Sequence, residues 1–296
     1  MKITSKTSKH SGYVALLGRT NVGKSTFLNA VLETKVAIVS DKPQTTRRQI
    51  LGIKTGPRGQ IIFFDSPGIH VPRFRLNEKM MKDVHNSSLD ADLLLYFVEI
   101  DDKRQDEFIM EMIKKVGKPT FLVINKIDKY KKSRALERID FFKGLYDWQE
   151  IVPISALKEE NLDVLEDLIY RYLPEGENFF PDGEYTQQSE RFYIAELIRE
   201  KILNLTRAEL PFTTTVMMEE IEDRGKVVYV RAEIYVETPS QRKIVLGKQG
   251  TLIKQIGEHA RKDIEEYFDH KVYLDLHVKV VSNWRNSPQI LKEIFD

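Results

Sequence analysis

Short apolar segments recur along the first 173 residues and alternate with stretches of helical periodicity. The apolar segments are rich in β-branched and aromatic residues, as expected for strands buried on both faces of a sheet. They are YVALL (13–17), QIIFFD (60–65), DLLLYFVEI (92–100), PTFLVIN (119–125) and IVPIS (151–155). We expect the intervening helices near residues 24–33, 75–89, 104–116, 133–146 and 161–173. This alternation predicts an α/β sheet with crossover helices.

One pair of strands departs from the parallel pattern. QILGIKT (49–55) and QIIFFD are separated by GPRG (56–59), which is a turn signal. An antiparallel hairpin is therefore expected within an otherwise parallel sheet, which then has six strands.

The periodicity stops at PEGENFFPDGEYTQQ (174–188), which holds two prolines and two glycines. With 296 residues, the chain is longer than a single core of typical size usually needs. We expect one domain over residues 1–175, a linker over 176–188 and a second domain over 189–296.

The second domain has a different order of patterns. A helix is predicted over SERFYIAELIREKILNLT (189–206), followed by a hairpin of TTTVMMEEIE (213–222) and KVVYVRAEIYVE (226–237) turned at 223–225. A helix, a GKQG loop (247–250), another helix and the alternating strand VYLDLHVKVV (272–281) come next. This order predicts a smaller α+β domain, and we expect a C-terminal tail helix after it.

Composition and charge set the class of protein. Hydrophobic residues make up 41% and charged residues 31%, and the formal net charge is only +1. Because cysteine is absent, disulfides, thiolate metal sites and cysteine nucleophiles are excluded. No window approaches a membrane span, and the polar first twelve residues are not followed by the apolar segment of a secretory signal, so we expect a cytoplasmic protein.

A glycine-rich loop follows the first predicted strand. GRTNVGKS (18–25) fits G-x-x-x-x-G-K-[ST] between a strand and a helix. In such a loop the backbone N–H groups surround a phosphate, Lys24 reaches the β- and γ-phosphates, and Ser25 offers its hydroxyl to Mg²⁺. The residues of this loop expected to contact a nucleotide are Asn21, Val22, Gly23, Lys24, Ser25 and Thr26.

Two further polar segments end predicted strands. In DSPG (65–68), Asp65 can bind Mg²⁺ directly or through water, and the N–H of Gly68 can contact the γ-phosphate. In NKID (125–128), the carboxylate of Asp128 can accept hydrogen bonds from guanine N1–H and the 2-amino group, which adenine cannot offer. Lys126 is expected to lie along the base or the loop, and Asn125 is expected to tie this loop to the phosphate loop.

Two other segments complete the predicted nucleotide site. Ser155, Ala156 and Leu157 follow the strand IVPI and are expected to contact the base. Between the first helix and the hairpin, the polar loop VAIVSDKPQTTRRQ offers a threonine that could close on Mg²⁺ and the γ-phosphate. Thr46 is the preferred residue and Thr45 the competing one.

A basic segment surrounds the GKQG loop. Six basic side chains and one acidic side chain lie between Gln241 and Lys262. A GxxG loop lets a nucleic-acid backbone approach without obstruction by side chains. The residues expected to bind RNA are Arg242, Lys243, Gly247, Lys248, Gln249, Gly250, Lys254 and Arg261. Trp284 and Arg285 could also meet RNA, although for Trp284 a place in the core is an equal alternative.

The four nucleotide motifs, in this order, resemble those of Ras-like GTPases. GRTNVGKSTFLN, KPQTTRRQILGI, DSPGIH and NKID are similar to the Era family of bacterial ribosome-assembly GTPases, and the likeness covers essentially the whole chain. The resemblance implies a P-loop GTPase domain followed by a type II KH domain. It also implies GTP, GDP and Mg²⁺ as ligands and, as partner, the small ribosomal subunit through the 3′ end of its rRNA, with no DNA. The family resemblance further allows a peripheral membrane contact, and we expect a monomer.

Two positions bear on the resemblance. Thr20 stands where Era-like loops usually have proline, and Ile69 follows Gly68 where Ras has the glutamine that orients the attacking water. Catalysis is therefore assigned to Lys24, Thr46, Gly68 and Asn21. In relatives, an asparagine at the position of Asn21 helps to bind K⁺, so the resemblance makes K⁺ a candidate activator.

Three functions fit this sequence to different degrees. The preferred hypothesis is a GTP-hydrolysing switch that controls RNA binding. The alternative is an RNA-binding assembly factor in which GTP is mainly a structural ligand. An ATP-driven RNA remodeler would fit the phosphate loop but leaves Asp128 unexplained.

Overall fold

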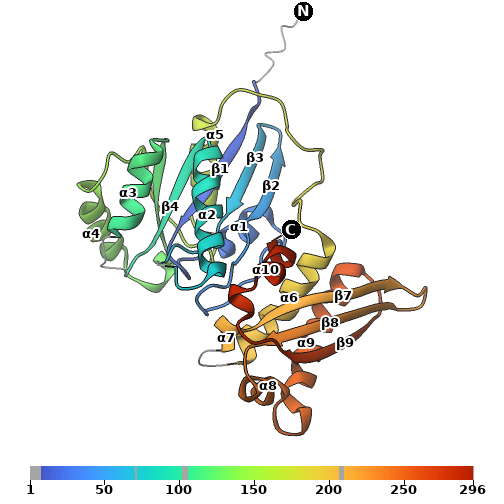
Figure 1. The fold of residues 1–296 in the computed structure, drawn as a ribbon. Coiled ribbons are helices and arrows are strands. Elements are labelled where there is room, and N and C mark those ends of the chain that lie inside the picture. The colour runs from blue at the N-terminus through green and yellow to red at the C-terminus, as the bar shows by residue number, and fades with distance from the viewer. Residues whose placement is uncertain (1–7, 71, 102–105, 207–209, 296) are drawn as a thin grey trace, which may run out of the picture. The chain divides into compact units, whose positions relative to one another are not determined.

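The computed structural model of the chain describes residues 8–70, 72–101, 106–206 and 210–295 (Figure 1). Its elements fall into two compact units. The first comprises Met1–Ala37, Thr46–Val71 and Lys79–Gln187, and the second comprises Ile38–Thr45, Pro72–Glu78 and Gln188–Asp296. Two short segments from the first half of the chain therefore pack with the C-terminal half.

The first unit is built on a six-stranded sheet with strand order β2-β3-β1-β4-β5-β6. Its strands are β1 (His10–Gly18), β2 (Ile50–Gly56), β3 (Gly59–Asp65), β4 (Leu93–Glu99), β5 (Thr120–Asn125) and β6 (Glu150–Pro153). Only β2 and β3 pair antiparallel; the other neighbours are parallel. The predicted mostly parallel sheet and its single hairpin are thus confirmed.

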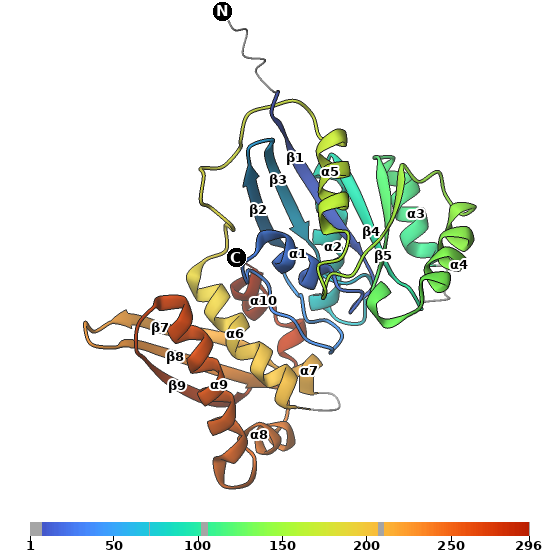
Figure 2. The same cartoon turned by 180° about the vertical axis from the view of Figure 1, so that it is seen from behind.

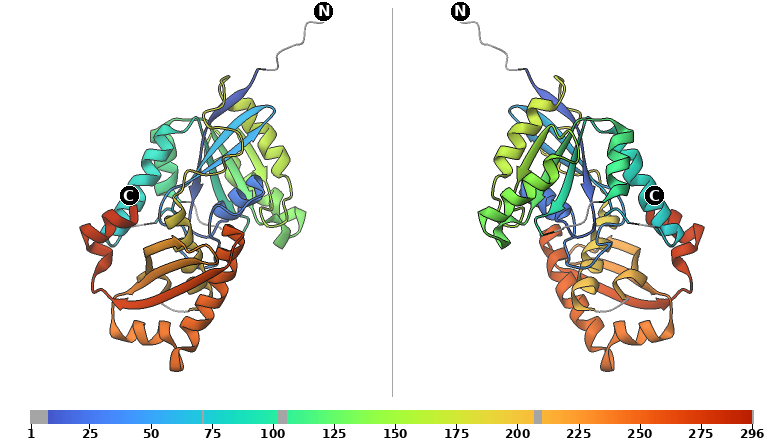
Figure 3. Two further views of the ribbon diagram at one scale, coloured as in Figure 1. Left: turned by 90° about the vertical axis from the view of Figure 1, so that its right-hand side faces the viewer. Right: turned by 90° about the vertical axis from the view of Figure 1, so that its left-hand side faces the viewer.

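Every residue of β3 and β5 is buried, which shows that both faces of this sheet are covered. Helices provide this cover. The helices are α1 (Lys24–Leu32), α2 (Arg75–Asp90), α3 (Glu107–Val116), α4 (Lys132–Lys143) and α5 (Leu162–Tyr172). Phe27 of α1 and Leu165 of α5 belong to the core on one face. Val84 of α2 and Ile109 of α3 belong to the core on the other face, and Figure 3 shows the two layers from the side.

Two helix boundaries differ from the prediction by three residues, and the others by no more than one. Helix α4 ends at Lys143 rather than at 146, because Gly144 follows it and ends the helix. Helix α3 begins at Glu107, where the side chain of Asp106 accepts a hydrogen bond from Ile109 N. The predicted start at residue 104 lies outside the described residues.

The parallel pairing brings four strand ends to one edge of the sheet. β1, β3, β5 and β6 run in the same direction, so their carboxyl ends lie together. The loops that leave this edge begin after Gly18, Asp65, Asn125 and Pro153. The phosphate loop, DSPG, NKID and the Ser155 loop are therefore on the same side of the first unit.

The second unit contains a three-stranded sheet with order β7-β8-β9. Its strands are β7 (Thr215–Asp223), β8 (Val228–Val236) and β9 (Val272–Val280), and its main helices are α6 (Glu190–Leu205), α8 (Pro239–Leu246) and α9 (Thr251–Phe268). β7 and β8 form the predicted antiparallel hairpin, whereas β8 and β9 are parallel. Figure 2 shows α6 and α9 in front of the strands, and Ile198 and Ile256 share one core with Val230.

Three further short elements belong to this unit. They are α7 (Leu210–Thr213), which the sequence did not predict, the turn η3 (Trp284–Asn286) and the tail helix α10 (Pro288–Phe295). Trp284 is fully buried and donates from Nε1 to the carbonyl of Thr213 at 2.9 Å. The alternative that gave Trp284 a place in the core is therefore correct, and a role in stacking on RNA is not.

No helix within the described ranges combines the length and the apolar character that crossing a membrane requires.

Candidate functional site

The phosphate loop joins the end of β1 to the start of α1. Gly18 and Gly23 have φ values of 142° and 98°, and Asn21 has a φ of 65°. A Cβ on Gly23 would lie 2.2 Å from Asn125 Nδ2, so only glycine fits there. These conformations curl the backbone as a phosphate-binding loop requires.

Lys24 lies inside this loop with 6% of its surface exposed. Its ammonium donates to the carbonyls of Gly18 at 3.2 Å and Arg19 at 3.0 Å. Burial lowers the pKa of Lys24 to about 8, and the nearby Asp65 carboxylate opposes this shift. A phosphate beside the ammonium would restore its charge.

Of the three predicted metal-binding residues, Ser25 lies within hydrogen-bond distance of the other two. Ser25 Oγ donates to Asp65 Oδ2 at 2.6 Å and lies 2.9 Å from Thr46 Oγ1. Asp65 is fully buried, and its Oδ1 has no hydrogen-bond partner in the part of the chain that the structure describes. Burial raises the pKa of Asp65 to about 6, although Lys24 and the Ser25 hydrogen bond act in the opposite direction. A buried carboxylate oxygen without a partner beside two hydroxyls suits a Mg²⁺ ion.

The structure separates the two candidate threonines of the loop. The hydroxyl of Thr46 meets Ser25, whereas that of Thr45 donates to the carbonyl of Lys42 at 2.6 Å. Thr46 is therefore the threonine whose hydroxyl contacts Ser25, the residue that also binds Asp65. Within the described residues, no group of three or more His, Cys, Asp or Glu side chains could hold a metal elsewhere.

Gly68 and Ile69 follow the strand end that carries Asp65. A Cβ on Gly68 would lie 2.5 Å from the backbone nitrogen of Thr20, so this loop passes directly against the phosphate loop. Ile69 donates its N–H to the carbonyl of Gly18 at 3.0 Å. Its side chain is 5% exposed and packs in the hydrophobic core with Val84, so it does not face water.

Asn125 ties three loops together at the same edge of the sheet. Its Nδ2 donates to the carbonyl of Val22 at 2.8 Å, as the sequence predicted. Its Oδ1 accepts from Lys126 N at 2.8 Å and from Ala156 N at 3.0 Å. The asparagine side chain thus connects the phosphate loop, the NKID loop and the Ser155 loop through hydrogen bonds.

The remaining base-loop residues form a second set of contacts. Lys126 donates to the carbonyl of Asn21 at 2.8 Å and to Glu99 Oε2 at 2.9 Å. Asp128 Oδ1 accepts from Ser155 Oγ at 2.6 Å. The sequence predicted a backbone contact from Ser155 to the base. The structure adds a hydrogen bond from the Ser155 side chain to Asp128. Glu99, at the end of β4, was not identified from the sequence because a single carboxylate after a strand carries no pattern.

An open pocket of about 520 Å³ continues from these loops. Thr26, Ala156 and Leu157 line it together with residues of α1 and its following turn. Among those, Asn29 accepts from the N–H groups of Val36 at 3.0 Å and Ala37 at 2.9 Å, and it donates to the carbonyl of Ala37 at 2.7 Å. Asn29 thereby anchors the start of the loop that leads to Thr46. An asparagine between the apolar residues Leu28 and Ala30 was the only sequence signal for this role.

The GKQG loop of the second unit joins α8 to α9. Gly247 has a φ of 73°, and a Cβ there would lie 2.7 Å from Leu252. Gly250 has a φ of 77° with no atom within 4 Å of such a Cβ, which leaves its outer side open. The side chains of Arg242, Lys243, Lys248, Gln249, Lys254 and Arg261 are exposed around it. The structure thus collects the predicted RNA-binding residues on two helices and their connecting loop.

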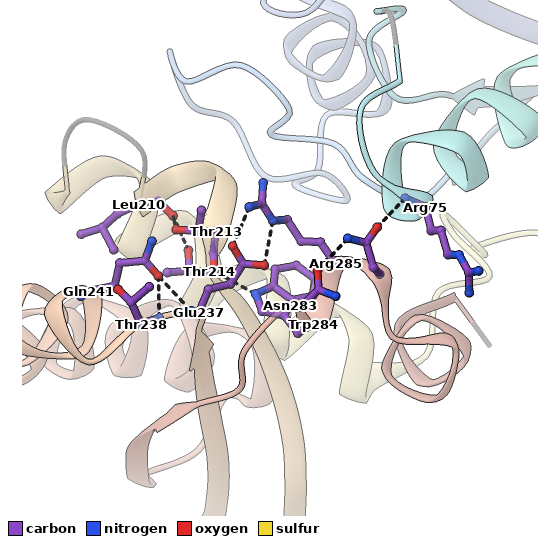
Figure 4. A network of polar contacts seen from close by, with 11 residues as sticks. Arg75, Leu210, Thr213, Thr214, Glu237, Thr238, Gln241, Asn283, Trp284 and Arg285 are labelled. Carbon is purple, nitrogen blue, oxygen red and sulfur yellow. Dashed lines mark hydrogen bonds and ion pairs between the residues drawn. The ribbon is translucent and has the colours of Figure 1, made fainter.

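Arg285 is not part of this basic surface. Its guanidinium binds Glu237 through two hydrogen bonds, from Nε at 3.1 Å and from Nη2 at 2.5 Å. Figure 4 shows Arg285 beside Trp284, Glu237 and Asn283. This arginine is engaged within the protein.

Comparisons with known proteins agree with this architecture. A family model described as a 50S ribosome-binding GTPase matches residues 13–126, and a KH-domain model matches residues 209–285. GTPase Era of Heliobacterium modesticaldum is 42% identical over 285 residues, which cover 95% of each protein.

Two solved structures are similar over nearly the whole chain. A single-residue variant of Era from Aquifex aeolicus bound to GDP and AlF4⁻ superposes with a TM-score of 0.92 at 40% identity, covering 96% of this chain and 98% of the relative. An Era complex with MgGDPNP and nucleotides 1506–1542 of 16S ribosomal RNA superposes with a TM-score of 0.93 at 40% identity, covering 97% and 98%. With this extent of similarity, the chain belongs to the Era family of GTPases.

Proposed function

We propose that this GTPase is a switch that binds the 3′ end of small-subunit ribosomal RNA through the GKQG surface and assists assembly of that subunit. The observation that carries the proposal is the set of hydrogen bonds from Asn125, which holds the phosphate loop and both base loops at one edge of the sheet. The relative solved with MgGDPNP and 16S rRNA nucleotides supports the choice of RNA.

The proposed nucleotide site uses the residues that the motifs identified. Lys24 and the N–H of Gly68 would stabilise charge on the γ-phosphate, and Asp128 would accept the two guanine donors. Water attacks the γ-phosphorus, the bond to the bridging oxygen breaks, and GDP and phosphate leave. The ribosyl-purine would lie beside Ala156 and Leu157.

Mg²⁺ would be held by Ser25, Thr46 and Asp65. The fit rests on Asp65, whose buried Oδ1 has no hydrogen-bond partner along the described segments. When bound, the ion neutralises part of the charge on the β- and γ-phosphates. Asp65 and Ser25 are already within 2.6 Å, so little rearrangement of the chain is needed.

K⁺ is proposed as an activator next to Asn21. Because the side chain of Ile69 is buried in the core, it cannot orient the attacking water. Intrinsic hydrolysis should then be slow and should depend on an added cation or a bound partner. Equal single-turnover rates in K⁺ and Na⁺ would remove the ion from the proposal.

The same observation on Ile69 favours a second candidate function. An RNA-binding assembly factor could use GTP as a structural ligand with incidental turnover. Phosphate release that stays near zero and does not respond to RNA would support this candidate over the switch.

The proposal also covers the organisation and surroundings of the chain. We propose a GTPase domain over residues 1–175, a linker over 176–188 and a KH domain with its tail helix over 189–296. The small ribosomal subunit as the assembly partner and a peripheral membrane contact are carried over from the family resemblance. A monomeric state and a cytoplasmic location are further parts of the proposal.

The test uses the full chain after its nucleotide has been stripped. Calorimetry with GTP and ATP in Mg²⁺ should show binding of GTP alone, and the RNA 3′-end fragment should bind in a separate titration. Lys24→Ala should abolish hydrolysis and leave RNA binding in place, whereas Lys114→Ala on the exposed side of α3 should change neither. Comparable affinities for ATP and GTP, or no binding of the RNA fragment, would refute the proposal.

A further inference from the structure

Two short segments that lie close in sequence to nucleotide-site residues belong to the second compact unit. They are Ile38–Thr45 and Pro72–Glu78, which cluster with Gln188–Asp296. Thr45 is joined directly to Thr46, the proposed Mg²⁺ ligand, and Pro72 comes four positions after Gly68. Each segment is therefore covalently close to a residue that is expected to respond to the γ-phosphate.

The first segment is held by one face of helix α6. Val39 N donates to Glu200 Oε1 at 3.0 Å, and Ser40 Oγ donates to Asn204 Oδ1 at 2.9 Å. Arg199 Nη2 donates to the carbonyl of Thr45. Glu200 and Asn204 share a face because they are four positions apart, and Arg199 precedes Glu200 directly.

Arg199 is a buried cation with a buried partner. The side chains of Arg199 and Glu196 are 2% and 12% exposed, and Arg199 Nε donates to Glu196 Oε1 at 2.6 Å. Arg199 Nη1 is buried without a hydrogen-bond partner along residues that the structure describes. Removing two charges from water is costly, so a gain in folding stability does not explain why this pair is buried.

The second segment is held by the turn η3 near the C-terminus. Arg75 N, at the first position of α2, donates to Asn286 Oδ1 at 3.1 Å (Figure 4). The guanidinium of Arg285 lies 3.8 Å from the ring centre of Phe74. Trp284, the first residue of η3, is fully buried, and Arg285 donates a hydrogen bond to Glu237. Both contacts fix the turn in place.

We propose that these two anchors, Glu196–Arg199 on α6 and Arg285–Asn286 on η3, are the sites through which nucleotide state and RNA binding are linked. This inference rests on the proposed function, because it assigns the regulation of that nucleotide site. It adds named residues to the switch, and none of them touches the nucleotide or the GKQG loop in the proposed arrangement.

The physical reason is the short reach of a hydrogen bond. Consecutive Cα atoms are about 3.8 Å apart, so a Thr46 that moves onto a metal and phosphate carries the Thr45 carbonyl with it. A shift of about 1 Å is enough to break the contact with Arg199 Nη2. The unpartnered Nη1 gives the guanidinium a second donor with which to hold the carbonyl in a shifted position. Movement of Thr46 would thus give the segment a second set of contacts with α6.

Coupling of this kind acts equally in both directions. If GTP favours one arrangement of Ile38–Thr45 and of the start of α2, then RNA that favours the same arrangement must tighten GTP by the same factor. Typical coupling factors are about 5- to 150-fold. The ratio of the dissociation constants of the RNA fragment in GDP and in a non-hydrolysable GTP analogue measures this factor.

The first test replaces the buried pair with neutral side chains of similar volume. In Glu196→Met/Arg199→Met, no charge is left unpaired, so the fold should survive. The ratio of RNA dissociation constants should depart from one by at least about fivefold in the parent and fall to within about twofold of one in the variant. Arg191→Met is the matched control, because this arginine of α6 binds the backbone of Met218 and Glu219 instead. It should keep the parent ratio.

The second test addresses the other anchor. Asn286→Ala removes the acceptor of Arg75 N and should lower the ratio, whereas Gln289→Ala, exposed on α10, should not. RNA affinity in a single nucleotide state should change less than threefold in both.

A measurement on the unaltered protein tests the inference even if the variants fail to fold. Amide exchange over residues 38–45 and 72–78 should change when the RNA fragment is added at constant nucleotide. Unchanged exchange there, a parent ratio of one, or a ratio that survives in both anchor variants would overturn the inference. GTP and RNA would still bind separately in each of those outcomes, so the proposed function would stand; loss of either binding in the parent would defeat the function itself.

Discussion

Lys24 and Asp65 are buried side chains of opposite charge whose pKa values both move toward neutrality. Burial lowers the pKa of Lys24 to about 8 and raises that of Asp65 to about 6, and each group partly opposes the shift of the other. Their charged forms are costly without a ligand, because both side chains are buried away from water. A triphosphate and a divalent cation would supply the opposite charges that each one needs.

The shift of Asp65 predicts how metal binding depends on pH. A folded-state pKa raised to about 6 means that the carboxyl keeps its proton up to that pH, and Mg²⁺ must displace this proton. The Mg²⁺-dependent part of the GTP affinity should therefore be full above pH 7 and fall roughly tenfold per pH unit below 6. Titrations with GTP between pH 5 and 8 measure this, and the same titrations in EDTA are the control. A Mg²⁺ contribution that is constant between pH 5 and 7 would contradict the assignment of Asp65.

Asp128 predicts a change of base preference. Asp128→Asn keeps the oxygen that accepts from Ser155 but loses the charge and one of the two acceptors offered to guanine. GTP should bind roughly 100-fold more weakly, since hydrogen bonds to a charged group are the stronger class. Xanthosine triphosphate should gain affinity, because its 2-carbonyl can accept from the new amide. Competition binding measures both, and Asp140→Asn on the exposed part of α4 should leave both unchanged.

At the scale of elements, the GKQG loop combines two glycines with different demands. A Cβ on Gly247 would strike Leu252, so that position serves the close packing of α8 and α9. Gly250 needs its positive φ, but space around it is open. The first glycine is therefore structural, and the second keeps the outer side of the loop accessible.

This difference predicts the effect of a charge at Gly250. Gly250→Asp places a carboxylate on the open side of the loop, where the RNA backbone is expected, and should weaken binding of the RNA 3′-end fragment by tenfold or more. Gly250→Asn is the control, because asparagine and aspartate both tolerate a left-handed conformation at a cost of about 1 kcal/mol. The aspartate variant should bind RNA more weakly than the asparagine variant although the two melt at similar temperatures. Equal affinities of the two variants would show that the loop does not meet phosphate.

Elements with strong local patterns could be predicted from the sequence. The buried strands β3 and β5 read as continuous apolar runs, and β8 reads as a strict alternation, because burial on two faces or one face imposes these periods. The short helix α7 has only four residues, too few for any period. The tie from Asn125 to the phosphate loop was also predictable, since parallel strands bring their carboxyl ends together.

At the scale of the whole molecule, prediction stops where contacts join distant segments. The pairing of Val39 with Glu200 spans 161 positions and that of Arg75 with Asn286 spans 211. Nothing near Ile38–Thr45 or Pro72–Glu78 marks these segments as parts of the second unit. The same holds for the core position of Trp284, whose partner Thr213 lies 71 positions away. Such contacts depend on the assembled fold rather than on any local period.

The balance of charge over the whole chain leads to a last prediction. With a net charge of +1, the molecule as a whole offers little attraction to RNA, so the basic side chains around the GKQG loop must supply the electrostatic part of the affinity. For single-stranded RNA, the logarithm of the affinity should fall with the logarithm of salt by about 0.7 per phosphate contact, which gives a slope near −4 if all six cations are engaged. Lys248→Gln/Lys254→Gln should reduce the slope to about −3.

The matched control is Lys114→Gln/Lys115→Gln on the exposed side of α3, which removes the same charge far from the loop in sequence. If the overall field of the molecule drew in the RNA, both double variants would lose affinity and slope alike. If the local surface does so, only the loop variant changes, and the control keeps the parent slope between about 50 and 200 mM salt. Because both variants carry the same net charge, only the position of the lost lysines can account for a difference between them.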